Sequence, residues 1–459
     1  MTDLNRRRFL LTAAALGGGI FAPSLRGLVA YAAAAEPFTG RRPIAPANAQ
    51  YGPLRPAGPE LALPDGFQYL KLGVEGAPMS DGELTPRAHD GMAAFQLPNG
   101  NVRLIRNHED RSAPANGQLR GPVETAYDRR GGGGTTSLEI RIHDDGTPEL
   151  VRDFVSLNGT IINCAGGPTP WGTWLTCEET TEGTRRGWEQ PHGYVFEVSA
   201  TAEEPRRSEP HRAMGRFTHE AVAVDPATGI VYLTEDRMTA GFYRFIPDRP
   251  GELAAGGRLQ MLGVRDQPQY ITGNGQQVGR TLPVIWIDID DPDPANAEVN
   301  PLAVFAQGYA RGAAIFTRLE GCWAGDGAIY FDATVGGNAE AGQIWQYRST
   351  DEEEGELTLI FESPSPDILN GPDNLTVSLR GGLVICEDND GAFVRGLTPD
   401  GEIFDIARNL ANDREFAGAC FSPDGRVLFF NIQGDVTVSG PGNLGMTFAV
   451  WGPWEAGPL

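Results

Sequence analysis

The sequence predicts an all-β fold, a six-bladed β-propeller with loop insertions. Three observations lead to this prediction. The 459 residues include 60 glycines and 35 prolines, which is typical of many short strands joined by turns. Six segments of similar form recur along the chain, and each is followed after a loop by a second β-run. No segment after residue 35 is apolar and long enough to cross a bilayer.

The six segments share a strand signature. Each begins after turn residues and is rich in β-branched and aromatic side chains, and most end in acids or amides. They lie at 101–110, 172–180, 229–237, 327–335, 381–390 and 425–433. A further short run precedes each of them. A unit of three or more strands that occurs six times favours a propeller, since a pair of β-sandwiches would not explain six like units.

The first 34 residues are predicted to be a twin-arginine signal peptide. Arg6 and Arg7 precede a short apolar run, and Ala-x-Ala cleavage sites lie near Ala34. A buried N-terminal helix is the alternative. Residues 35–459 would then form a single propeller domain. We expect the twin-arginine machinery as an export partner, and a periplasmic or secreted protein that folds with its cofactor before it crosses the membrane.

Composition narrows the classes of partner. The net charge of −23 argues against nucleic acid and against stable association with anionic membranes, and we expect a monomer. Lys71 is the single lysine, so anion binding must depend on arginine. The number of cysteines is odd, which leaves at least one thiol unpaired within the chain. Four of them lie inside apolar runs and are expected to pack in the core: Cys177, Cys322, Cys386 and Cys420.

One ligand-type residue stands just before a small residue in the first strand of each unit. These residues are Asp90, Cys164, Glu220, Glu320 and Asp373, with Glu415 a little earlier in the sixth unit. Because first strands line the channel of a propeller, we expect the six to converge on the axis. The small residues would keep the strands close where space is short.

A ring of this kind predicts a multinuclear metal site. Five carboxylates a few ångströms apart cannot all stay ionised without cations. Carboxylates suit hard cations, and one thiolate favours a transition metal at its corner. Acids that only bind turn backbone, and Cys164 as a buried filler, are the alternatives. Acids that close the second strands, including Glu109 and Glu179, are further candidate ligands, and His89, His108 and His219 could hold ligands in place or ligate weakly.

An arginine beside this ring indicates an oxyanion substrate. Arg318 lies two residues before Glu320, so both side chains can face the channel. A guanidinium matches phosphate bidentately, and metal ions would polarise the phosphoryl oxygens.

The sequence resembles the PhoX-type alkaline phosphatase family over most of residues 35–459. The resemblance rests on the motifs at 107–110, 163–179, 214–221, 318–321 and 421–433. It implies hydrolysis of small phosphate esters with a cofactor of two Fe³⁺ and three Ca²⁺ ions around a bridging oxo group. By motif, Cys164 and Glu220 would bind iron, Glu320 and Asp373 would bind metal such as calcium, and Arg318 would hold the phosphate.

The chain departs from the longer family members in three respects, one of which is that no His-Pro pair follows the motif at 421–433. It is also a compact member, and Thr135 stands where an asparagine is expected, which makes Thr135 a candidate phosphate contact. Two other classes of function stay open on the sequence. One is a calcium-stabilised propeller that serves as a binding scaffold, and the other is a propeller lactonase or phosphotriesterase with few metals.

Overall fold

The structure, a computed structural model, describes residues 50–459 except 352, 439 and 441. The predicted signal peptide, residues 1–34, lies outside the described residues. The described residues belong to one compact unit of the chain.

Antiparallel strands form six units that follow one another along the chain. The first three units are β4 (His89–Gln96), β5 (Val102–His108), β6 (Gly134–Ile142) and β7 (Pro148–Asn158); β8 (Asn163–Pro168), β9 (Thr173–Glu178) and β10 (Val195–Ser199); and β11 (His219–Val224), β12 (Val231–Glu235), β13 (Phe242–Pro247) and β14 (Gly257–Val264). The last three are β16 (Leu319–Gly325), β17 (Ala328–Ala333), β18 (Gln343–Ser349) and β19 (Glu354–Glu362); β20 (Pro372–Val377), β21 (Leu383–Glu387), β22 (Phe393–Leu397) and β23 (Ile403–Asn409); and β24 (Phe416–Phe421), β25 (Val427–Ile432) and β26 (Met446–Trp451).

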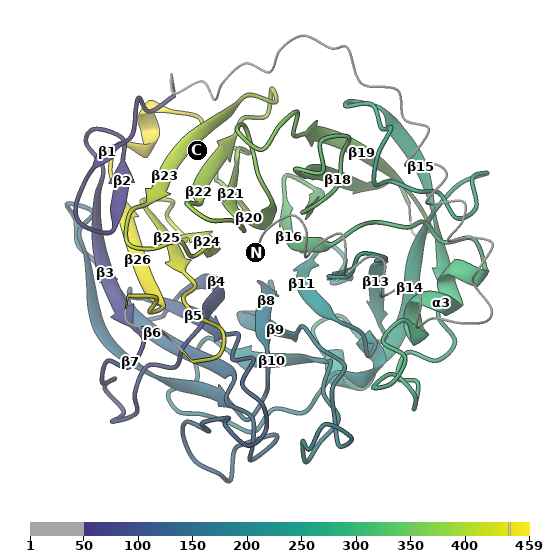
Figure 1. The fold of residues 1–459 in the computed structure, drawn as a ribbon, viewed down its shortest axis with the longest axis horizontal. Helices are drawn as coiled ribbons and strands as arrows, with labels where there is room; N and C mark the ends of the chain where they lie inside the picture. The colour runs from purple at the N-terminus through teal and green to yellow at the C-terminus, as the bar shows by residue number, and fades with distance from the viewer. Residues whose placement is uncertain (1–49, 352, 439, 441) are drawn as a thin grey trace. The chain divides into compact units, whose positions relative to one another are not determined.

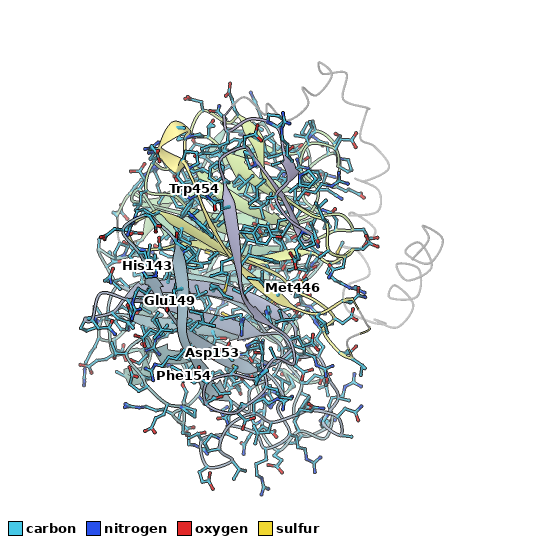
Figure 2. All side chains as sticks on the ribbon, turned by 90° about the vertical axis from the view of Figure 1, so that its left-hand side faces the viewer. His143, Glu149, Asp153, Phe154, Met446 and Trp454 are labelled. Carbon is cyan, nitrogen blue, oxygen red and sulfur yellow. The ribbon has the colours of Figure 1, made fainter. Side chains whose placement is uncertain are left out.

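Four further strands join the units. β15 (Thr281–Asp288) pairs with both β14 and β19, so the third and fourth units share one nine-stranded sheet. β1 (Arg55–Pro56) and β2 (Leu61–Leu63) extend the fifth unit. β3 (Gln68–Val74) is the outermost strand of the sixth unit and pairs with β26, so a segment early in the chain completes the last sheet. Figure 2 shows this side, with Met446 at the start of β26 and Trp454 just beyond its end.

The first strands of the six units close a ring. β4, β8, β11, β16, β20 and β24 each pack against the next, and β24 packs against β4 (Figure 1). Apolar clusters fill the interface between each unit and its neighbour around the whole ring. The prediction of an all-β propeller architecture is confirmed.

Helices are few in the described part of the chain. They are α3 (Ala303–Ala310) and the short 3₁₀ helices η1 (Arg212–Met214), η2 (Leu253–Ala255) and η3 (Trp454–Ala456). No helix among the described residues is long and apolar enough to span a membrane. All five cysteines are free and buried, and the four that were expected in the core lie in the apolar clusters.

Three second strands end in a glutamate that braces the loop to the third strand. Glu178 accepts hydrogen bonds from the backbone of Gly193, Glu235 from that of Gly241 and Glu387 from that of Phe393. These carboxylates accept from backbone amide groups that would otherwise lack a partner on that side of the chain. The residue after each of these glutamates, Glu179, Asp236 or Asp388, lines the cavity at one end of the ring.

Glu178 also forms a buried ion triad. His192 lies between Glu178 (Nδ1 to Oε1, 2.6 Å) and Asp128 (Nε2 to Oδ2, 3.4 Å), and none of the three side chains is exposed. Burial alone would lower the pKa of His192, but the charge of Glu178 and the hydrogen bond to Asp128 raise the pKa to about 9. His192 is therefore charged in the folded protein at neutral pH.

We predict that His192→Gln removes a pH-dependent part of the unfolding free energy. Because the pKa of His192 is higher in the folded than in the unfolded protein, its protonation stabilises the fold below about pH 6.5, and this contribution is lost as the pH rises through about 9. The difference corresponds to ~3 kcal/mol. Urea unfolding of both metal-free proteins at about pH 6 and about pH 9.5 measures it. The same pH dependence in both would contradict the ion triad.

Candidate metal centre

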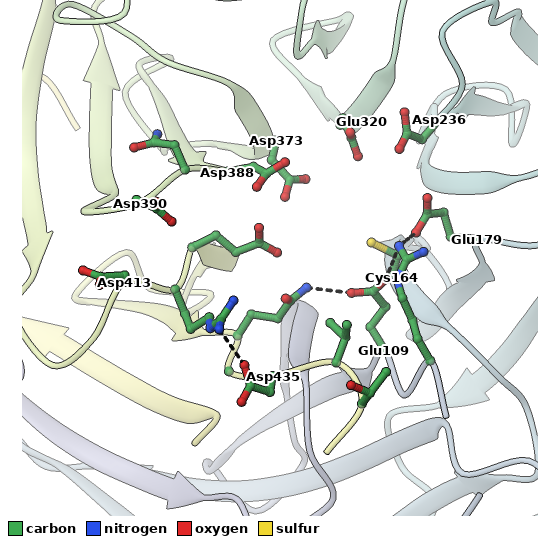
Figure 3. A pocket seen from close by; sticks show the side chains of 18 of the residues that line it. Glu109, Cys164, Glu179, Asp236, Glu320, Asp373, Asp388, Asp390, Asp413 and Asp435 are labelled. Atoms are coloured by element: carbon green, nitrogen blue, oxygen red, sulfur yellow. Dashed lines mark hydrogen bonds and ion pairs between the residues drawn. The ribbon is translucent and has the colours of Figure 1, made fainter. Parts of the chain in front are cut away.

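A cavity of about 450 Å³ opens at one end of the axis, and all six units contribute to its wall. Ten carboxylates and one thiol line it against three guanidinium groups, so the cavity attracts cations (Figure 3). The lining residues are Glu109, Arg111, Cys164, Glu179, Asp236, Arg318, Glu320, Asp373, Asp388, Asn389, Asp390, Asp413, Arg414, Glu415, Gln433, Gly434, Asp435, Val436 and Thr437.

A β-bulge in each first strand positions the side chains at the axis. The register of every first strand shifts against its second strand, which leaves two residues without a direct partner. Such bulges re-aim side chains. In five units the first unpaired residue is the one that the sequence singled out: Asp90, Cys164, Glu220, Glu320 and Asp373.

In four of these five units the next residue is glycine or alanine, and at the two glycines the next strand leaves no room for a side chain. A β-carbon on Gly91 would lie 2.6 Å from the Cα of Ala165 in the neighbouring unit. A β-carbon on Gly321 would lie 2.7 Å from the backbone nitrogen of Leu375. Neither separation is tolerated between unbonded heavy atoms, so glycine is required at both positions. The crowding expected from the sequence is present.

The converging side chains form three adjacent groups that could each hold a metal ion. In each group, one ligand atom per residue lies within 4.8 Å of the others. The groups are Asp90, Glu109 and Cys164; Cys164, Glu179 and Glu220; and Glu220, Glu320 and Asp373. Because Cys164 and Glu220 each belong to two groups, ions bound in the three would share ligands.

The sixth unit departs from the pattern. In β24 the bulge follows the second paired residue, Ala417, whereas in the other first strands it follows the first paired residue. Ala417 therefore has the position that the ligand residues have in the other units, and its side chain has no atom that can bind a metal. The carbonyl of Glu415 accepts a hydrogen bond from Gln433, as the carbonyl of Arg318 does from Thr334. Glu415 thus occupies the place of Arg318 in the repeat. Its side chain still lines the cavity, but it belongs to none of the three groups.

Second-strand ends form an outer layer of the site. Glu109, Glu179, Asp236, Asp388 and Gln433 each come directly after a second strand and line the cavity. The Gln433 amide donates to Asp90 (2.8 Å) and to Glu109 (2.7 Å), which links the two layers.

Burial and crowding change the acid–base behaviour of the ring. Burial raises the pKa of Glu220 well above its usual range, and the carboxylates of Glu320 and Glu179 raise it further. Burial also raises the pKa of Asp90 and of the Cys164 thiol, with neighbouring carboxylates adding to the effect. A bound cation reverses this balance, because it favours the ionised carboxylate and thiolate.

The surroundings of Glu220 indicate that a metal ion fits this site. It is fully buried, and neither of its carboxylate oxygens has a hydrogen-bond partner. A buried carboxylate without a donor is costly unless a cation binds it. The thiol of Cys164, 3.7 Å from Asp90, adds a donor that prefers transition metals. The donor set therefore fits a mixed cluster of transition-metal and hard cations.

Comparison with known families decides the class of the protein. The family model described as alkaline phosphatase PhoX matches residues 49–435. The chain belongs to this family. It is thus a member of a family of phosphatase enzymes, as its motifs predicted. No curated protein sequence matches the chain.

One solved structure supports the fold. The structure of Pseudomonas fluorescens PhoX in complex with vanadate, a transition-state analogue, is 19% identical, with a TM-score of 0.66 over 91% of this chain and 98% of that one. A gluconolactonase of Xanthomonas campestris is more distantly similar, at 12% identity over 87% of this chain and 99% of that one, with a TM-score of 0.38.

Some residues singled out from the sequence do not line the cavity. The Thr135 hydroxyl is buried against Ser156 (2.7 Å), because β6 is a third strand and lies away from the axis. His89, His108 and His219 are also directed elsewhere, toward backbone carbonyls of Pro86, Arg87 and Gly215 respectively. Among the cavity residues, Arg111 was missed by the sequence analysis. Its place two residues after Glu109 mirrors that of Arg318 before Glu320.

We predict opposite effects for two glutamate-to-glutamine changes. Glu220→Gln should raise the unfolding free energy of the chelator-treated protein by ~1 kcal/mol or more, since a carboxyl with a raised pKa destabilises the fold at neutral pH. It should also lower the metal content. Glu178→Gln, the matched control, should lower stability by breaking the ion triad and leave the metal content unchanged. Urea unfolding and elemental analysis of both variants are the measurements. Unchanged metal content in Glu220→Gln would remove Glu220 from the site.

Proposed function

We propose that this chain hydrolyses small phosphate monoesters in the axial cavity, with a cofactor of two Fe³⁺ and three Ca²⁺ ions around a bridging oxo group. Membership of the alkaline phosphatase PhoX family supports the reaction class. The observation that carries the proposal is the contact of Arg318 with Glu320, because it sets an anion-binding group beside a cation-binding one.

Each ligand group has a role in this proposal. Cys164 and Glu220 hold iron, and Glu320 and Asp373 hold calcium. Asp90, Glu109 and Glu179 complete the ligand groups, and Glu415 approaches the same cavity from the sixth unit. Ions held by these residues would polarise the phosphoryl oxygens and would supply a nucleophile at neutral pH.

Arg318 is the phosphate-binding residue in this proposal. Its guanidinium donates to Asp236 (3.0 Å) and contacts Glu320, and it lies 3.6 Å from Asp388. These carboxylates fix the planar group, while 27% of the side chain stays exposed to the cavity. The backbone of Arg318 has a φ of 46°, a conformation that costs a non-glycine residue on the order of 1 kcal/mol. A fixed guanidinium can bind two phosphate oxygens at once.

We also propose that the protein is exported in its folded state. The twin-arginine signal would carry the folded, metal-loaded protein to the periplasm or out of the cell, where we infer that it acts as a monomer. Its substrates would be small phosphate esters that reach the cavity by diffusion.

We predict that two substitutions separate metal binding from phosphate binding. Glu320→Gln should lower both metal content and turnover. Arg318→Ala should keep the metals, weaken inhibition by phosphate and lower kcat/KM on the order of 10²–10³. Metals per chain and aryl phosphate kinetics are measured for both variants and the wild type. Full activity in Arg318→Ala would refute the phosphate contact. Full metal occupancy and activity in Glu320→Gln would refute the axial site and favour a scaffold.

A further inference from the structure

We propose that Arg111 is a second phosphate-binding residue, which approaches the substrate from the wall formed by the first and second units. The inference rests on the proposed function, because it concerns the same cavity. Arg318 comes from the fourth unit, so the two guanidinium groups would contact the phosphate from different sides.

Arg111 lies at the junction of two ligand groups. Its guanidinium contacts Glu109 and Glu179, and these two carboxylates belong to neighbouring groups that share Cys164. Figure 3 shows Glu109, Cys164 and Glu179 close together at one side of the cavity. An anion bound to ions in these two groups would therefore lie within reach of Arg111.

The surroundings of Arg111 repeat those of Arg318. Each guanidinium contacts one carboxylate two residues away in the chain and another from a different unit. Both line the cavity, and 40% of the Arg111 side chain is exposed. The structure records no hydrogen bond from Nη1 of Arg111 to the described residues, so this nitrogen is free to donate to a ligand.

Arginines with a purely structural role look different in this protein. Arg395 is 4% exposed, and its guanidinium contacts Glu387 and Asp405, outside the cavity. Arg216 is 5% exposed and donates to three backbone carbonyls. An arginine that is anchored but still open to the cavity is suited to bind an anion. A phosphate monoester dianion has three non-bridging oxygens, enough for two arginines and the metal ions.

The test compares four proteins: wild type, Arg111→Ala, Arg111→Lys and Arg129→Ala. Arg129 is an exposed arginine that pairs with Glu189 outside the cavity, so its substitution controls for the change in net charge. Inorganic phosphate is the probe. Its inhibition constant, the kcat/KM for an aryl phosphate, and iron and calcium per chain are measured for each.

We expect Arg111→Ala to weaken phosphate inhibition about tenfold or more, since hydrogen bonds to charged groups are the strong ones. Its kcat/KM should fall on the order of 10²-fold with metals unchanged. Arg111→Lys should recover part of the affinity, because it keeps the charge and loses the fork. Arg129→Ala should match the wild type.

Three results would overturn the inference. In the first, phosphate inhibition is unchanged in Arg111→Ala but is weakened in Arg318→Ala. This result would exclude Arg111 as a phosphate-binding residue and leave the proposed function intact. Loss of metal in step with loss of activity would make Arg111 a support for Glu109 and Glu179. Absence of phosphatase activity in the metal-loaded wild type would instead refute the proposed function itself.

Discussion

Mutual repulsion among buried carboxylates is the constraint on which this structure depends. Bulges in successive first strands direct Asp90, Glu220, Glu320 and Asp373 toward one axis, where burial and neighbouring charge disfavour ionisation. The fold withstands this because apolar clusters close the ring between all units. The site is therefore unfavourable for the metal-free fold and favourable for a bound cluster of cations, which is a common relation between stability and function.

Much of the fold followed from the sequence because its signals are local and repeated. Strand runs bounded by glycine turns recur, and ligand residues before small residues mark the first strands. The bulges themselves were not predictable, since a register shift depends on the partner strand. For that reason the sequence analysis took Glu415 as the ring residue of the sixth unit. In the structure, Ala417 has the position in that unit that Glu320 has in the fourth. Thr135 was placed by motif alone, and its strand lies away from the axis.

The paired acids at second-strand ends show a further limit of sequence analysis. Glu178 and Glu179 are adjacent and chemically alike, but one braces a loop and the other lines the cavity. Alternation along a strand decides between them, and a one-residue change in register would exchange their roles. Arg111 lay beyond sequence analysis for a related reason, since its contact with Glu179 joins residues of two units.

Diffraction at the iron absorption edge, from crystals of active protein purified without chelator, tests the central claim most directly. Cations at the axis predict an anomalous peak within coordination distance of both Cys164 and Glu220, the two residues that the ligand groups share. An axis without bound metal in crystals that still hydrolyse phosphate esters would contradict the account.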